Sequence, residues 1–172
     1  MHEPQNMIRS AEPADFPSIL ELNADSVHFL SPLDIQSLGH LHKQAAYHKV
    51  IEIDGRIAAF LLAFREGADY DSPNYVWFSR CYDSFLYIDR AVVHQDQRRK
   101  GYGAALYNDL IGFAAGTGVK IITCEVDIQP PNQGSLIFHE TYGFREVGTQ
   151  WLSGGRKQVS LREKRLPTPG AR

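Results

Sequence analysis

The chain has 172 residues, 43% hydrophobic and 22% charged, with a formal net charge of −2. This size and composition fit one globular domain with its own core, and the slight negative charge gives no long-range attraction to nucleic acid. No apolar run approaches the roughly 20 residues of a membrane-spanning helix, and the first residues lack the apolar stretch of a signal peptide. We therefore expect neither nucleic acid nor a membrane as a partner.

The first third of the chain predicts two helices followed by a hairpin. A short strand is expected at 7–10, followed by a helix that Asp15 could cap. A second helix is expected over 34–48. Residues 49–64 then form two apolar runs around Asp54-Gly55, a dipeptide that is a strong signal for a hairpin turn.

The remaining chain predicts alternating strands and helices. Residues 67–83 are expected to form a long, aromatic-rich connection, and the nearly continuous apolar run at 85–93 favours a central strand. After it we expect a helix at 101–115, a strand at 119–128, a helix at 130–143 and an antiparallel strand pair, 144–152 and 156–166. This order predicts an α/β fold with one mixed sheet and helices on its faces. Residues 1–6 and 166–172 are expected to be disordered.

The cysteines and histidines give no metal signature. Cys81 and Cys124 are too few for a disulfide scaffold and lack the spacing of metal sites. We expect both to be buried small hydrophobes in a reducing, cytoplasmic setting. His40, His42 and His48 do not have the i, i+4 spacing of a zinc helix, so each is expected to be solvated or half-buried.

The most informative stretch is RRKGYG at 98–103, between the central strand and the next helix. Gly101 and Gly103 allow the backbone to approach a ligand closely, and the amides of a helix start attract an anion. Arg98, Arg99 and Lys100 add positive charge at the same place. The interpretation is a turn that holds a pyrophosphate; the alternative is a solvated turn that requires glycine. Neither the Rossmann fingerprint nor the P-loop pattern fits.

A second motif, N-x-x-S-x-x-F-H-x-x-x-G-F, occupies 132–144. Together with R-x-x-G-x-G at 98–103 it resembles the GNAT superfamily of acyl-CoA-dependent N-acetyltransferases. The resemblance implies a single domain over 7–165 with a mostly antiparallel sheet of about seven strands. It also implies transfer of an acetyl group from acetyl-CoA, without a metal, to a primary amine of a small molecule, peptide or protein. Homodimers are frequent in this family, so a second copy is a candidate partner.

The resemblance assigns cofactor contacts to three segments. Backbone groups of the strand end would pair with the pantetheine arm, the turn would cradle the pyrophosphate, and the second motif would contact the pantetheine side. The residues are Ala91, Val92, Val93, Arg98, Arg99, Lys100, Gly101, Tyr102, Gly103, Ala104, Asn132 and Phe138. Asn132 could instead serve as a helix N-cap.

Attack of an amine on a thioester needs a base, and the best candidate is Asp89 in its apolar strand. Tyr87 would lie beside Asp89 on the same face of the strand. The alternative is an ion pair between Asp89 and Arg90, although neighbouring strand residues point to opposite faces. Glu125 on the next strand is the second candidate for the base.

The family commonly places a tyrosine acid, for the leaving thiolate, seven residues after the asparagine. Here that position is His139, which could donate a proton or could merely pack on the cofactor. Tyr142 could replace the missing hydroxyl or could be a core aromatic.

Two other classes of function remain open at this point. One is a non-catalytic acyl-CoA-binding regulatory or sensor module; the other is a nucleotide-binding protein that uses 98–103. The aromatic residues of 67–83 could shape an acceptor pocket, or could form a minicore or a dimer contact.

Overall fold

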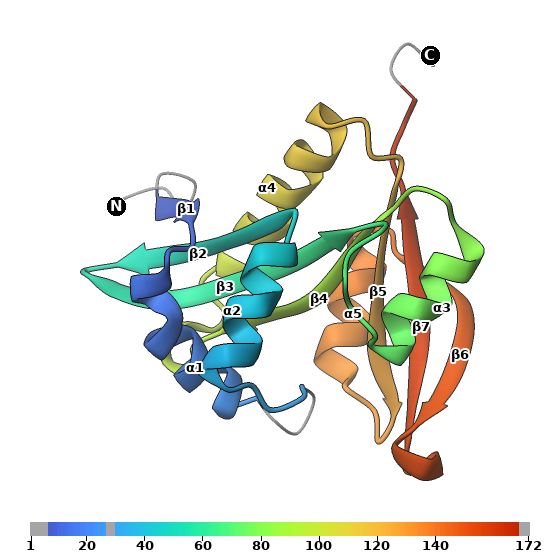
Figure 1. The fold of residues 1–172 in the computed structure, drawn as a ribbon, viewed down its shortest axis with the longest axis horizontal. Helices are drawn as coiled ribbons and strands as arrows, with labels where there is room; N and C mark the ends of the chain where they lie inside the picture. The colour runs from blue at the N-terminus through green and yellow to red at the C-terminus, as the bar shows by residue number, and fades with distance from the viewer. Residues whose placement is uncertain (1–6, 27–29, 169–172) are drawn as a thin grey trace. The chain divides into compact units, whose positions relative to one another are not determined.

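The computed structural model describes residues 7–26 and 30–168 (Figure 1). It contains a seven-stranded sheet in the order β1-β2-β3-β4-β5-β7-β6. β4 and β5 run parallel, whereas β1–β2, β2–β3, β5–β7 and β6–β7 are antiparallel. The expected mixed, mostly antiparallel sheet is confirmed. The chain forms two compact units, one reaching to Phe64 with Ile88–Phe113 added, the other made of Arg65–Tyr87 and the chain from Ala114.

The first unit places two helices over a strand hairpin, with α1 and α2 in front of β2 and β3 (Figure 1). Apolar side chains of both helices pack with Val50 and Phe60 of the hairpin and Val92 of β4 into one buried cluster. The elements are β1 (Ile8–Ser10), the 3-10 turn η2 (Pro13–Asp15), α1 (Phe16–Ala24), α2 (Ile35–Gln44), β2 (Tyr47–Ile53), β3 (Arg56–Arg65), β4 (Leu86–Val93), the 3-10 turn η3 (Gln95–Gln97) and α4 (Tyr102–Gly116).

The ends of the two N-terminal helices differ from the sequence predictions. Asp15 precedes α1, but its carboxylate accepts from the backbone N–H of Glu12 and from Arg9 and makes no side-chain cap to α1. The prediction of a helix over 34–48 was too long, because α2 ends at Gln44. Residues from Tyr47 onward pair with β3 instead, since strand pairing there satisfies the backbone and buries apolar side chains.

The second unit carries β5, β6 and β7 with a helix on each face. Glu163 and Arg162 are neighbours on β7, so their side chains leave opposite faces. Glu163 accepts from Tyr82, which caps α3, whereas Arg162 lies 3.7 Å from Glu140 of α5. The elements are α3 (Pro73–Cys81), β5 (Ile121–Gln129), α5 (Gln133–Thr141), β6 (Arg145–Leu152), the 3-10 turn η4 (Ser153–Gly155) and β7 (Lys157–Arg165).

The stretch 67–83 is not only a connection, because it contains helix α3. Tyr75 and Phe78 are 3% and 0% exposed, so these two aromatic residues belong to a core, as the minicore alternative held. Trp77 packs on β6 so closely that a Cβ on Gly148 would lie 2.7 Å from its ring. A short helix with Pro at its first turn thus anchors the segment.

The cysteine prediction holds for one residue. Cys124 is buried, and burial raises the pKa of its thiol well above the usual value. Cys81 is exposed at the end of α3, so the expectation that it is buried was wrong.

At the chain ends, the segments 1–6 and 169–172 lie outside the described residues. Leu166, the first residue of the tail predicted to be disordered, donates its N–H to the carbonyl of Lys120 at 2.8 Å. Within the described ranges no helix is long and apolar enough to cross a membrane.

Candidate functional site

The turn at 98–103 follows η3 and leads into α4. Arg98, Arg99 and Lys100 are exposed, and α4 begins at Tyr102. Arg99 has φ 63° and Gly101 has φ 86°, so the backbone passes twice through the left-handed region. Glycine adopts that conformation without strain, which explains Gly101 in this turn.

The same turn is open and positively charged. A Cβ added to Gly101 would meet no heavy atom within 4 Å. Lys100 Nζ donates to Gln97 at 3.1 Å, and in the described part of the chain no ion pair involves Arg98, Arg99 or Lys100. Open backbone at a helix start beside three cations suits a diphosphate.

The strand end before this turn has one accessible residue. Ala91 is exposed, Val92 is buried in the core cluster and Val93 is half-buried. His94, just beyond, is tied to β3 through its N–H, which donates to the carbonyl of Ala58 at 2.8 Å. The alternation leaves Ala91 on the face that does not enter the core.

Asn132 is the N-cap of α5. Its Oδ1 accepts from the N–H of Ser135 at 3.2 Å, and its own N–H donates to the carbonyl of Asp127 at 2.9 Å. The capping alternative is therefore observed, and a contact with a ligand stays a prediction. Phe138 is half-buried, with its ring centroid 4.9 Å from that of Tyr142.

His139 is buried in α5, 6% exposed, with its Nδ1 2.7 Å from the carbonyl oxygen of Ser135. A carbonyl only accepts, so Nδ1 carries the hydrogen and donates it. Burial lowers the pKa of His139 and so favours the neutral ring, whose Nδ1 hydrogen is already donated to the carbonyl of Ser135. Its ring also stands edge-on to that of Phe144, with the two ring centroids 5.2 Å apart. This geometry favours the packing alternative.

Asp89 forms the ion pair that strand alternation argued against. Its Oδ2 lies 2.6 Å from Nε of Arg90, and both side chains are at most 5% exposed. Arg90 Nη1 also donates to Oδ1 of Asn23 at 2.8 Å and to the carbonyl of Ser31 at 3.1 Å. The Asp89 carboxylate is therefore committed to an ion pair inside the core, and removal of either partner would leave a buried charge unpaired.

Tyr87 and Glu125 are brought together in the second unit. The Tyr87 hydroxyl donates to Oε2 of Glu125 at 2.7 Å. Tyr87 is fully buried against Tyr75, whereas Glu125 is partly exposed. Glu125 thus accepts from a neutral hydroxyl, whereas Asp89 accepts from a guanidinium.

Asn23 is a buried partner of the Asp89–Arg90 pair that the sequence analysis missed. It is 1% exposed in α1 and donates Nδ2 to the carbonyl of Ser31 at 3.0 Å while accepting from Arg90. A signal existed, because Asn23 falls four residues after Ile19, on the buried stripe of α1. Among the residues that the structure describes, no group of three His, Cys, Asp or Glu side chains could hold a metal ion.

Comparison with protein families gives a match over most of the chain. The model described as "Acetyltransferase (GNAT) family" matches residues 8–144. The chain belongs to this family, as the two motifs indicated. A search of curated proteins found no match.

Solved structures share the fold at low sequence identity. Ard1 from Thermoplasma volcanium superposes with TM-score 0.76 at 16% identity, covering 94% of this chain and 97% of that one. YncA from Salmonella typhimurium, solved with acetyl-CoA, superposes with a TM-score of 0.72 at 20% identity, and the match covers 96% of both chains. Naa20 from Chaetomium thermophilum, in complex with a bisubstrate analogue, superposes with a TM-score of 0.73 at 19% identity, and the match covers 92% of this chain and 86% of that one.

Proposed function

We propose that this protein is an acetyl-CoA-dependent N-acetyltransferase that moves an acetyl group to a primary amine by direct attack. The observation that carries the proposal is the turn at 98–104, with its exposed cations and its open backbone at Gly101. Membership of the GNAT family and the acetyl-CoA complex of YncA support the choice of ligand.

The turn would hold the diphosphate of acetyl-CoA. Amides of Arg99 to Ala104 and the start of α4 would donate to phosphate oxygens, and Arg98, Arg99 and Lys100 would add charge. Ala91 to Val93 would offer backbone groups to the pantetheine arm, and Asn132 and Phe138 are proposed as further contacts of the cosubstrate. The cosubstrate would supply the thioester carbon that the amine attacks.

We place the general base at Glu125 rather than at Asp89. Glu125 is partly exposed and oriented by the Tyr87 hydroxyl at 2.7 Å, whereas Asp89 is held by Arg90. A positioned carboxylate can accept the proton that the amine loses, directly or through water. His139 is assigned a packing role, and Tyr142 becomes the candidate donor to the thiolate. Burial raises the pKa of Tyr142, so its hydroxyl keeps its proton at neutral pH.

The acceptor is proposed as a primary amine of a small molecule, a peptide or a protein. One structural neighbour acts on a protein amine by its name, the ribosomal-protein-S18-alanine N-acetyltransferase from Escherichia coli. The second candidate function is an acyl-CoA sensor module, which the ion-paired Asp89 and the neutral His139 favour.

The test is calorimetric titration of the full chain with acetyl-CoA, with ATP and NADH as controls. We expect saturable binding of acetyl-CoA only, followed by thiol release in the presence of a panel of amines. Binding without thiol release from any amine would favour the sensor module. Failure to bind acetyl-CoA, or equal binding of ATP, would contradict the proposal.

A further inference from the structure

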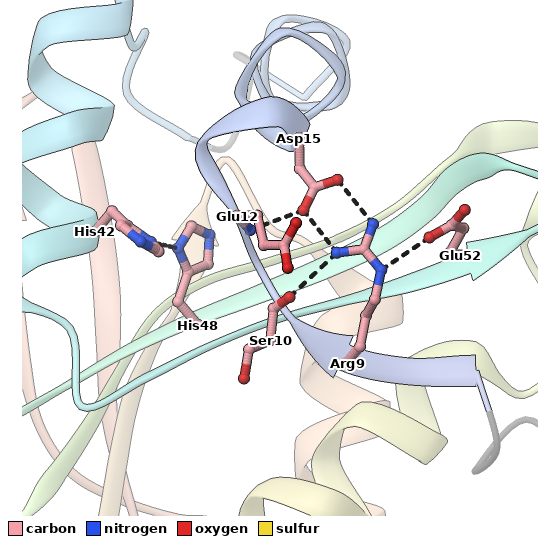
Figure 2. Close-up of polar contacts among 7 residues, drawn as sticks. All are labelled: Arg9, Ser10, Glu12, Asp15, His42, His48 and Glu52. Carbon is pink, nitrogen blue, oxygen red and sulfur yellow. Dashed lines mark hydrogen bonds and ion pairs between the residues drawn. The ribbon is translucent and has the colours of Figure 1, made fainter.

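Two histidines of the first unit share one hydrogen bond. His42 of α2 and His48 of β2 face each other with their Nδ1 atoms 2.8 Å apart (Figure 2). One Nδ1 must carry a hydrogen while the other offers its lone pair. The bond therefore exists only while at least one of the two imidazoles is neutral.

His48 is the more buried partner. It is 8% exposed, its ring centroid lies 6.4 Å from that of Phe60, and its Nε2 has no hydrogen-bond partner among the described residues. His42 is half-buried and stands edge-on to Phe16 at 5.1 Å. A proton added to His48 would thus be a buried charge with no acceptor at Nε2, which is costly.

The charged groups around the pair do not offset that cost. Asp15 is the anion that faces His48, but its two oxygens accept from Nη1 and Nη2 of Arg9 at 2.8 Å each (Figure 2). The N–H of Glu12 also donates to Asp15, and Arg9 reaches Glu52 at 2.8 Å. From β3, the facing residues are Leu62 and Phe60, which carry no charge.

The electrostatic balance agrees with this geometry. The pKa of His48 is lowered to about 4, mainly by burial and to a smaller extent by the neighbouring His42. Asp15 acts in the opposite direction but more weakly. At neutral pH the pair accordingly holds its hydrogen bond, and acid favours any state in which His48 reaches water.

We propose that the His42–His48 pair is a pH-sensitive latch that holds α2 on β2 at neutral pH and releases α2 when both imidazoles are protonated. Both rings then carry N–H groups at Nδ1, so the bond is replaced by repulsion between two cations. This device goes beyond the proposed acetyl transfer and does not depend on it.

Release of α2 would open the helical layer of the first unit. Leu38 and Leu41 are the buried residues of α2, and Leu38 packs in the same cluster as Val50 and Phe60. His42 follows Leu41 directly, so the latch sits beside the last apolar anchor of the helix.

The test is hydrogen exchange of the full chain at pH 7.5 and pH 5.0, corrected for the intrinsic effect of pH. In the wild type we expect the protection of the α2 amides to fall at least about tenfold at pH 5.0 relative to those of β5, since the open state takes up the proton. In His48→Phe, which keeps an aromatic ring beside Phe60 but cannot titrate, the α2 protection should not change. The matched control is His40→Gln, an exposed histidine of the same helix, which should behave as the wild type.

An unchanged α2 protection in the wild type, or an equal loss in His48→Phe, would overturn the proposal. If His48→Phe does not fold, His42→Gln and NMR titration of the wild-type imidazoles replace it. We then expect His48 to stay neutral until α2 opens. Protonation of both rings with α2 still protected would also refute the latch.

Discussion

The turn at 98–103 and the buried carboxylate of Asp89 differ in how far their polar groups are already engaged in bonds within the protein. Arg98, Arg99 and Lys100 are exposed and carry no ion pair in the described residues, so they can turn to a ligand. Asp89, in contrast, is held at 2.6 Å by Arg90 inside the core. A residue that binds a ligand needs unused hydrogen-bonding capacity, whereas the polar groups of a residue that stabilises the fold are already bonded to other protein groups. The comparison separates binding groups from structural ones within the same unit.

The largest effect is expected where a carboxylate is oriented but partly exposed. Glu125→Gln should lower kcat about 10²- to 10⁴-fold, because a general base contributes on that order, and should leave acetyl-CoA affinity unchanged. Steady-state thiol release and calorimetry measure the two quantities. Asp83→Asn, an exposed carboxylate of the same unit, is the control. A kcat close to that of the wild type would remove Glu125 from the reaction.

Asp89→Asn tests the structural side of the comparison. It should lower the free energy of unfolding by about 3–5 kcal/mol, because loss of one partner leaves a buried charge unpaired. Urea denaturation measures this, with Asp69→Asn as an exposed control. Material that stays folded should retain its kcat. A stable variant with kcat reduced like that of Glu125→Gln would restore Asp89 as the base.

Gly103→Val tests the turn. A branched side chain at the second residue of α4 would occupy the space of a phosphate, so acetyl-CoA should bind about 100-fold more weakly, or about 2.7 kcal/mol. Gly112→Val in the same helix is the matched control, since a Cβ there meets no atom within 4 Å. Unchanged affinity, together with a native circular dichroism spectrum, would contradict the phosphate-binding interpretation.

The smallest effect concerns acid stability of the first unit. His48 has a folded pKa of about 4, below its unfolded value of 6.5, so its contribution is present above pH 6.5 and is lost as the pH falls toward 4. Between pH 7.5 and 5.0 the wild type should lose about 2 kcal/mol from this source.

Arg9→Gln would leave the charge of Asp15 uncompensated, raise the pKa of His48 and reduce that loss by about 1 kcal/mol. Urea midpoints at the two pH values measure the difference, with the exposed Arg156→Gln as control. A loss equal to that of the wild type would show that Arg9 does not tune the pair.

The sequence predicted those parts of the fold and of the candidate site that depend on local chemistry. The hairpin at Asp54-Gly55, the alternating strands and the glycine-rich turn follow from backbone preferences and periodicity, and the structure has them. The extent of α2 and the bond between Asp89 and Arg90 depend on distant partners, β3 in one case and Asn23 in the other. Helix α3 was missed because its aromatic side chains carried weak periodicity, although Ser72-Pro73 could have indicated a helix start.

The contact of Trp77 with Gly148 has a consequence for local unfolding. A glycine within a strand weakens that strand, and here an indole from α3 covers the gap it leaves. β6 is therefore stabilised in part by packing against α3, a helix far away in sequence. We expect α3 and β6 to open and close as one cooperative unit, and the emission of Trp77 would report the opening of both.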